Sequence, residues 1–285
     1  MGVSKQDMMD EVDRIGREEY DEDGNPKTLG YEDLDEMFED GAEGAVFAAD
    51  ELQIPFLRLA QQMSPQLNKK DAKFIEGLSS GDIFNTLTEQ NYGEGVLIIP
   101  CFSKTTYTEW VPRDMGGGRV QEFSADKLPK TERISLGGKT VDQLDNGNEL
   151  VTSDDHYCLV IDEEGNFEPV LLDMKSTQRK VAKRWRTMVT MNKARNPKTQ
   201  KLQVLPLYST IWKLTSVDET NKKNETYSNY AIQKVGPLTK EQRELYEEAK
   251  AFRESVKAGE VRASEGEETE EQVAAAKKRD EEIPF

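Results

Sequence analysis

The run HYCLVI, residues 156–161, is followed by the polar segment DEEGN, residues 162–166, and by a second apolar run, FEPVLLD, residues 167–173. A short polar segment containing glycine between two runs of β-prone residues is typical of a β-hairpin. The sequence therefore predicts two paired strands here, within a β-rich body.

Further elements are expected on both sides of this hairpin. Strands are predicted over residues 83–87, 96–102, 107–111, 204–217 and 227–235, and a polar turn is expected at 218–225. A helix is expected over 177–193 and another around Lys69, Lys70 and Lys73. The glycine-rich stretch 112–150 predicts a long surface excursion with one short strand. We find no internal repeats.

The C-terminal part of the chain begins with a helix signal. Thr239-Lys240-Glu241-Gln242 matches a capping box, in which Thr239 is the N-cap and Gln242 reaches back. The residues that follow carry a stripe of apolar side chains up to Val256. After Gly259 the chain has almost no large apolar residues until Ile283, which predicts a flexible tether.

These signals divide the chain into four parts. We expect an acidic, largely disordered arm over residues 1–52, with at most a marginal helix over 31–38. A β-rich body follows over 53–237, then a helix over 238–258, and then a flexible acidic tail over 259–285. The predicted fold class is a β-rich α+β fold, an OB-like barrel with added helices between acidic flanks.

Composition excludes several classes of protein. The chain has no apolar run of membrane-spanning length and no secretory signal after its first residues. Cys101, Cys158 and His156 are the only cysteines and histidine, too few for a zinc site of four Cys and His ligands and no basis for a disulfide framework. We expect a soluble cytoplasmic protein with no cofactor and no bound metal.

Charge is distributed unevenly along the chain. The formal net charge is −17, but the acidic excess lies in the two flanks, whereas residues 53–239 are nearly balanced. Acidic tails keep a protein soluble, and they can also compete with a polyanion for a basic groove. The whole-chain charge therefore does not exclude nucleic-acid binding.

Residues 174–201 contain ten basic residues and no acidic one. Lysine and arginine neutralise phosphates and release counterions, which gives salt-sensitive binding that tolerates any sequence. A solvated helix face anchored in the core by Trp185 is the alternative interpretation. The candidate DNA-binding residues from this run are Lys175, Arg179, Lys180, Lys183, Arg184, Trp185, Arg186, Lys193 and Arg195.

Aromatic residues on the predicted strands extend this candidate interface, because aromatic rings can stack on exposed bases. Tyr107 and Trp110 precede Arg113, and Tyr208 and Trp212 lie near Lys213. Four residues apart on one strand, Tyr208 and Trp212 are expected to point to the same face, whereas Tyr107 and Trp110 are not. Each of these rings is equally consistent with a place in the core.

The last six residues are Asp280, Glu281, Glu282, Ile283, Pro284 and Phe285. This tip resembles the C-terminal tip of bacterial single-stranded DNA-binding proteins, in which the terminal Phe enters an apolar pocket on a partner. The resemblance covers only the tip. It implies docking of replication and recombination proteins at these six residues, with the carboxylates steering toward a basic partner.

The body is similar to the single-stranded DNA-binding proteins of tailed bacteriophages, on the basis of Ser176-Thr177-Gln178 and the basic run that follows. This resemblance implies a non-enzymatic protein that binds single-stranded DNA without sequence specificity, protects it in the host bacterial cytoplasm and recruits partners through its tail. The sequence leaves the oligomeric state open.

Two other functions are open. Val170 to Lys175 ends in Asp173-Met174-Lys175, which resembles the core of the PD-(D/E)xK nucleases, with Asp162 as a second carboxylate for Mg²⁺. Asp154-Asp155-His156 could be a fragment of a proton relay, but no matching nucleophile motif accompanies it. An acidic virion or adaptor protein would explain the flanks, but neither the terminal Phe nor the basic run.

Overall fold

The computed structural model describes residues 53–136, 139–162, 165–221, 224–259 and 262–263. The expected N-terminal arm, its marginal helix over 31–38, and the tip at 280–285 lie outside these residues. Among the described helices, none has the length and apolar character needed to cross a membrane.

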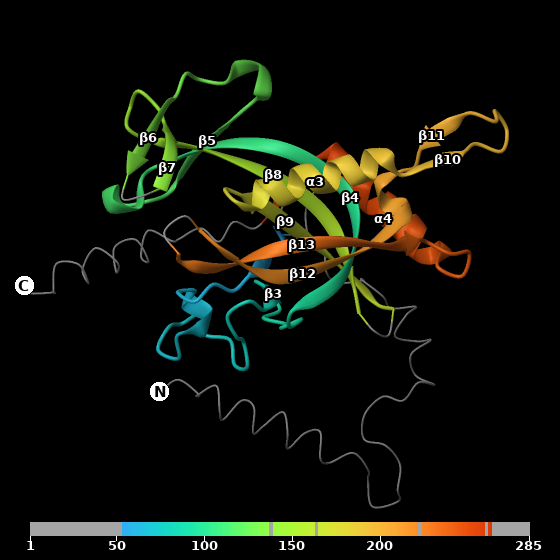
Figure 1. The fold of residues 1–285 in the computed structure, drawn as a ribbon, viewed down its shortest axis with the longest axis horizontal. Helices are drawn as coiled ribbons and strands as arrows, with labels where there is room; N and C mark the ends of the chain where they lie inside the picture. Colours follow the sequence, from blue (N-terminus) through green and yellow to red (C-terminus); the bar gives the residue numbers. More distant parts are fainter. Residues whose placement is uncertain (1–52, 137–138, 163–164, 222–223, 260–261, 264–285) are drawn as a thin grey trace, which may run out of the picture. The chain divides into compact units, whose positions relative to one another are not determined.

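An eight-stranded antiparallel sheet forms the centre of the described chain (Figure 1). Its strand order is β13 (Thr226–Pro237), β12 (Thr210–Thr220), β4 (Gly95–Trp110), β8 (Glu149–Ile161), β7 (Lys139–Gln143) and β6 (Glu132–Leu136). Two more strands pair beside this path: β5 (Arg119–Phe123) with β4 and β9 (Phe167–Lys175) with β8. Within the described residues the sheet does not close on itself, so the predicted barrel was wrong, whereas the β-rich α+β class was correct.

The predicted hairpin is strands β8 and β9, which pair with Ile161 opposite Phe167 and His156 opposite Leu172. Every residue of β8 from Ser153 to Ile161 is buried, because helices and loops cover both faces of this part of the sheet. Successive side chains on a strand point to opposite faces. The hairpin therefore supplies apolar residues to two separate cores.

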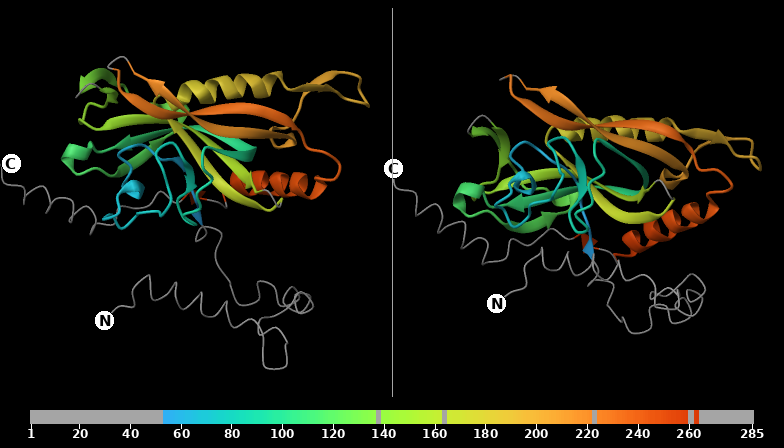
Figure 2. Two further views of the ribbon diagram at one scale, coloured as in Figure 1. Left: turned by 60° about the horizontal axis from the view of Figure 1, so that its bottom comes forward. Right: turned by 90° about the horizontal axis from the view of Figure 1, so that it is seen from below.

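One core lies under helix α3 (Gln178–Met191), and the other lies under helix α4 (Arg243–Ala258), on the opposite side of the sheet (Figure 2). Cys158 and Val160 contribute to the first core, and Leu159 and Ile161 to the second. The alternating direction of the side chains along β8 thus determines whether each residue packs in the core under α3 or in the core under α4.

Short elements complete the body. Strand β1 (Gln53–Ile54) pairs with β14 (Arg262–Ala263), and β2 (Leu57–Leu59) pairs with β3 (Ile83–Asn85). The expected helix near Lys69 is absent: within this described stretch only the 3₁₀ turn η1 (Pro65–Leu67) is helical. Asn68 and Asp71 instead accept hydrogen bonds from the backbone N–H groups of Lys70 and Lys73, and such local bonds compete with a helix.

The strands predicted over 96–102 and 107–111 are one continuous strand, β4, because the threonines and serine between them also favour extended backbone. The predicted surface excursion over 112–150 is more ordered than expected. It contains the 3₁₀ turns η2 (Arg113–Met115) and η3 (Ala125–Lys127) and strands β5, β6 and β7, and it includes the start of β8.

Helix α3 confirms the predicted helix over 177–193 to within two residues. The backbone N–H of Thr239 donates to Gln242 Oε1 at 3.0 Å, so the expected reach-back by Gln242 is present. Thr239 makes no N-cap bond, however, because α4 begins at Arg243 and its N-cap position is Gln242. Gly259 ends the helix with φ of 77°, a conformation that glycine adopts without strain.

A two-stranded arm follows α3. Strands β10 (Lys193–Arg195) and β11 (Leu202–Val204) pair with each other and extend beyond the C-terminal end of α3, away from the sheet (Figures 1 and 2). The 3₁₀ turn η4 (Leu207–Ser209) then leads into β12. We call β10, β11 and the residues that join them the basic arm.

Candidate nucleic-acid interface

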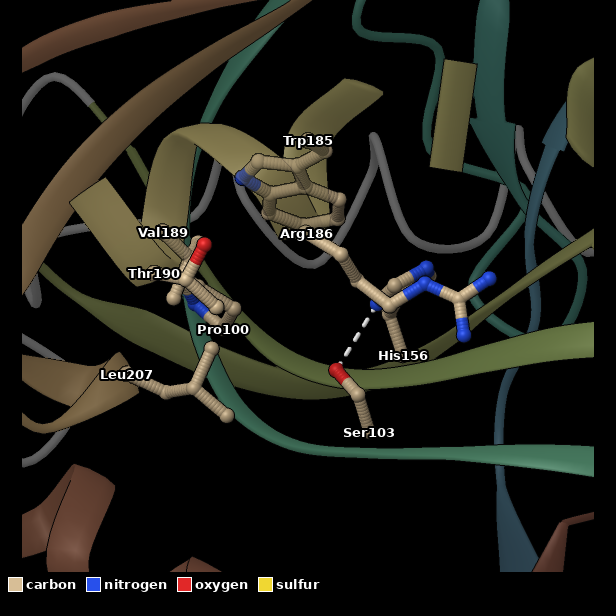
Figure 3. Close-up of a pocket in the computed structure, with 8 residues that line it drawn as sticks. All are labelled: Pro100, Ser103, His156, Trp185, Arg186, Val189, Thr190 and Leu207. Carbon is tan, nitrogen blue, oxygen red and sulfur yellow. Dashed lines mark hydrogen bonds between the residues drawn. The ribbon is translucent and has the colours of Figure 1, made fainter. Parts of the chain in front are cut away.

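Helix α3 is seated on the sheet by Trp185, which is 1 % exposed. The Trp185 ring packs against His156, with 4.6 Å between ring centroids (Figure 3). It also meets Trp212 edge-on, with 6.0 Å between centroids. The sequence made Trp185 a candidate DNA-binding residue, with a place as the core anchor of the helix as the alternative. In this structure its ring is enclosed and anchors the helix in the core.

The His156 side chain is buried and lies 2.8 Å through Nδ1 from the Oγ of Ser103 on β4 (Figure 3). The pKa of His156 is lowered to about 4, chiefly by burial. The charge of nearby Asp154 raises this pKa, and the charge of Arg186 lowers it. The imidazole is therefore neutral at pH 7. His156 Nδ1 contacts Ser103 and His156 Nε2 has no hydrogen-bond partner among the described residues, so neither Asp154 nor Asp155 bonds to the ring and the proton relay considered from the sequence is not formed.

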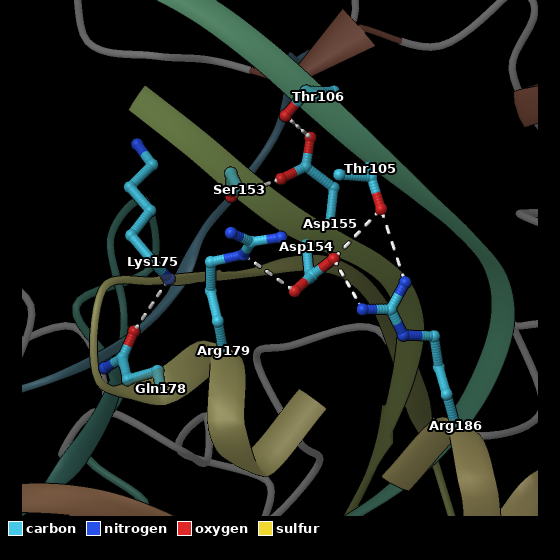
Figure 4. Close-up of polar contacts among 9 residues, drawn as sticks. All are labelled: Thr105, Thr106, Ser153, Asp154, Asp155, Lys175, Gln178, Arg179 and Arg186. Carbon is cyan, nitrogen blue, oxygen red and sulfur yellow. Dashed lines mark hydrogen bonds and ion pairs between the residues drawn. The ribbon is translucent and has the colours of Figure 1, made fainter. Parts of the chain in front are cut away.

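The buried carboxylate of Asp154 binds two arginines of α3 (Figure 4). Arg179 Nε lies 3.1 Å from Asp154 Oδ2, and Arg186 Nη2 lies 2.9 Å from Oδ1. The two arginines are two helical turns apart and so share one face. We call this arrangement the Asp154 clamp.

Thr105 completes the Asp154 clamp from strand β4. Its hydroxyl donates to Asp154 Oδ1 at 2.9 Å and accepts from Arg186 Nη1 at 3.3 Å. Arg179 and Arg186 keep 30 % and 43 % of their side-chain surface exposed. These two arginines therefore orient the helix and still present part of their guanidinium groups to solvent.

The outward side of α3 carries three further bases, Lys180, Lys183 and Arg184, all exposed. Lys180 lies near the carboxylate of Glu219. Hydrogen bonds from Tyr227 and Asn229 lower the pKa of Glu219, and the charge of Lys180 lowers it further. Because Lys180 interacts with this carboxylate, Lys183 and Arg184 are the helix cations best placed to meet an external polyanion.

The basic arm continues this surface without any acidic residue. Its exposed bases are Lys193, Arg195, Lys198 and Lys201. Arg195 Nη1 donates to the backbone oxygen of Gln200 across the arm at 2.6 Å. Exposed apolar side chains accompany these cations: Met191 is 73 %, Leu202 62 % and Val204 51 % exposed. Cations interleaved with accessible apolar groups suit a flexible polyanion that also has apolar faces.

The predicted strand aromatics are distributed differently from expectation. Tyr208 lies in η4 and packs against Tyr246 of α4, whereas Trp212 lies in β12 and packs under α3. The prediction that Tyr208 and Trp212 share a face was wrong, because β12 begins only at Thr210 and carries a bulge between Ile211 and Trp212. Both rings are buried.

Tyr107 and Trp110 lie on β4 and are half-buried. The ammonium group of Lys175 lies 5.6 Å from the centroid of the Trp110 ring, a cation–π distance. Arg113 begins η2, directly after this strand. Lys175 and the Trp110 ring thus form a second aromatic and basic contact, at the end of β9.

The nuclease hypothesis requires Asp162 beside Asp173, and the register separates them. Asp173 stands opposite Asp155, while Asp162 follows Ile161 at the far end of the hairpin, about 20 Å along the strand. Asp162 accepts a hydrogen bond from the backbone of Asn166 at 2.8 Å, as in an ordinary turn.

Asp173 is engaged by cations, since it pairs with Arg58 and, at 2.9 Å, with Lys175. Asp155 accepts hydrogen bonds from Ser153 at 2.6 Å and Thr106 at 3.0 Å, and burial raises its pKa. In the part of the chain that the structure describes, no three His, Cys, Asp or Glu residues are grouped so that they could hold a metal ion.

Ser103, Lys104 and Thr105 on β4 belong to this region, and sequence reasoning missed them. They stand opposite His156, Asp155 and Asp154 in the pairing of β4 with β8. Alternating polar residues on a strand were the available signal, but their partners follow from a register between segments about 50 residues apart. That register cannot be read from one sequence.

A protein-family model described as "Pam3 phage gp34-like protein" matches residues 25–262. The match covers most of the chain, so the protein belongs to this phage gp34-like family. No curated protein and no solved structure matches the chain.

Replacing Asp154 with Ala is expected to lower the free energy of unfolding by about 1–3 kcal/mol, since it leaves polar groups at a buried site without their partner. Urea denaturation followed by circular dichroism measures this change. Asp142→Ala is the matched control, because Asp142 pairs with Arg133 at 2.9 Å on the surface. The control should change stability by less than about 1 kcal/mol. Equal losses in both variants would contradict a structural role for the Asp154 clamp.

Stability is expected to depend on pH through His156. Its pKa falls from 6.5 to about 4 on folding, so below pH 6.5 the unfolded chain binds a proton that the folded chain does not. The free energy of unfolding should therefore decrease by up to about 3 kcal/mol between pH 6.5 and pH 4 on account of this residue. His156→Gln should remove that part of the pH dependence in denaturation curves. An unchanged pH profile in the variant would show that His156 is not the group responsible.

Proposed function

We propose that this member of the phage gp34-like family binds single-stranded DNA without sequence specificity. The observation that carries the proposal is the run of ten basic and no acidic residues over 174–201, whose exposed members lie on the outward side of α3 and on the basic arm. In a protein of net charge −17, a concentration of cations is not needed to keep the protein soluble. Neutralising the phosphates of a nucleic acid is a function that such a surface can perform.

The arrangement of the cations favours contact with a backbone over readout of base edges. Lys183 and Arg184 are exposed on one turn of α3, and the Asp154 clamp fixes the helix that carries them. The basic arm adds a second set of cations beyond the end of the helix. Contacts of this kind hold a strand in place but do not distinguish its sequence.

The C-terminal tip supports the choice of single-stranded DNA. Residues 280–285 resemble the partner-docking tip of bacterial single-stranded DNA-binding proteins, and the exposed apolar groups beside the basic arm suit unpaired bases. In this proposal the tail recruits replication and recombination proteins and competes with DNA for the basic surface. The chain acts without catalysis.

Substitution of Lys183 and Arg184 by Ala tests the surface. The slope of log K against log salt should become shallower by about 1.4, because two phosphate contacts to a single strand are lost. Fluorescence anisotropy of a labelled oligonucleotide across a salt series measures the slope.

Lys69→Ala with Lys70→Ala is the matched control for that experiment. Both lysines are exposed, the change in net charge is the same, and they lie in a turn outside α3 and the basic arm. The control should keep the slope of the unmodified protein. If the two double variants gave the same slope, the interface would not be on α3.

Deletion of residues 280–285 tests the competition by the tail. The truncated chain should bind oligonucleotide more tightly at low salt, and the difference should shrink as salt rises, because the screening length falls from about 10 Å at 0.1 M to about 3 Å at 1 M. Phe285→Ala keeps every acidic side chain and should leave DNA affinity unchanged. Affinity that is the same with and without the last six residues would rule out competition by the tip.

A further inference from the structure

A cavity of about 230 Å³ lies between α3, strands β4 and β8, and η4 (Figure 3). Pro100, Val189 and Leu207 line its apolar end, and the rings of His156 and Trp185 form an aromatic wall. The cavity is smaller than the 300–1,000 Å³ of sites for drug-sized ligands. Its size suits one small planar group.

A second, polar cavity of about 180 Å³ adjoins the first and shares Ser103, His156 and Arg186 with it. Lys104 and Thr105 also line this part. Figure 3 shows the guanidinium group of Arg186 on the side away from Leu207. The combined groove therefore runs from an apolar, aromatic end to an end that carries basic side chains.

Asp154 lines the polar cavity but does not make it anionic. Its carboxylate pairs with both Arg179 and Arg186. Two arginines around one carboxylate leave this end with an excess of positive charge. Lys104 does not add to it, because its side chain lies on the Asp155 face of the sheet and pairs with Glu122 at 3.8 Å. A phosphate is thus the complementary group for this end.

The lining of the first cavity is almost wholly apolar. Nε2 of His156 and Nε1 of Trp185 make no hydrogen bond among the described residues, but both atoms are covered by their neighbours and do not face the opening. An occupant therefore contacts this cavity by packing against the rings of His156 and Trp185. A flat heterocycle, which stacks on aromatic rings, suits such a wall.

From these features we infer that the cavity holds one unpaired nucleobase of a bound single strand, with the adjacent backbone phosphate at Arg186. This inference rests on the proposed function and adds to it a specific base subsite. Trp185 takes part as a wall of the subsite from its place in the core, and not as an exposed stacking platform. A duplex cannot use the subsite, because its bases are paired and stacked.

Thr190→Phe provides the test. Thr190 is exposed on α3 and lines the cavity, so a larger side chain there fills the cavity without replacing a core residue. Thr187→Phe is the matched control, because Thr187 is also an exposed threonine of α3, and both hydroxyls donate to backbone oxygens of the helix. Thr187 does not line the cavity.

The full chain and both variants are titrated with oligo(dT) and with an abasic phosphodiester oligomer of the same length, after urea denaturation has shown that each variant is folded. The preference for oligo(dT) should be about ten-fold larger in the unmodified protein and in Thr187→Phe than in Thr190→Phe, equivalent to the stacking of one base. Thr190→Phe should keep its affinity for the abasic oligomer.

The two proposals fail in different ways. A preference that Thr190→Phe retains, or equal binding of both oligomers by the unmodified protein, would overturn the base subsite and leave single-strand binding intact. Failure of both oligomers to bind would overturn the proposed function itself. Binding of thymidine monophosphate that Thr190→Phe abolishes, without any binding of oligo(dT), would assign the cavity to a free nucleotide and overturn the inference. If Thr190→Phe does not fold, Thr190→Leu replaces it with the same expected loss of preference.

Discussion

The ion pairs between buried Asp154 and two arginines of α3 position the rest of the candidate interface. Asp154 lies on β8, the strand whose residues build the cores on both faces of the sheet, so the Asp154 clamp ties the helix to the most enclosed part of the fold. Trp185 fixes the same helix from the apolar side. With one face held by packing and by charge, the opposite side of α3 must present its cations to solvent.

The basic residues of α3 and the basic arm fall into two groups, those that bind Asp154 and those that face solvent, and the second group gives this acidic chain a basic surface. Arg179 and Arg186 are committed to the protein, whereas Lys183, Arg184 and the bases of the basic arm face outward. The groove beside Arg186 lies next to both anchors of the helix. Its polar end is formed by residues of the Asp154 clamp, and the ring of Trp185 lines its apolar end. A strand that follows the outer cations would reach the groove at Arg186.

Local patterns in the sequence were sufficient for the central hairpin, for α3 and for most of α4, since each depends on periodicity and turn residues within one segment. The open sheet and the placement of Tyr208 and Trp212 could not be predicted, because a bulge and the late start of β12 decide them. The concentration of basic residues over 174–201 could be recognised directly from the sequence. Which of these residues bind Asp154 depends on the packing of α3 on β8, and the groove depends on α3, β4, β8 and η4 meeting.

We propose unpaired DNA as the ligand of the basic surface. The decisive experiment is fluorescence anisotropy of one labelled sequence, offered as a single strand and as a duplex across a salt series and finally with Mg²⁺. The protein should bind the single strand more tightly, lose affinity steeply with salt, and leave the oligonucleotide intact after Mg²⁺ is added. Equal or tighter binding to the duplex, no binding to either, or cleavage on addition of Mg²⁺ would contradict this proposal.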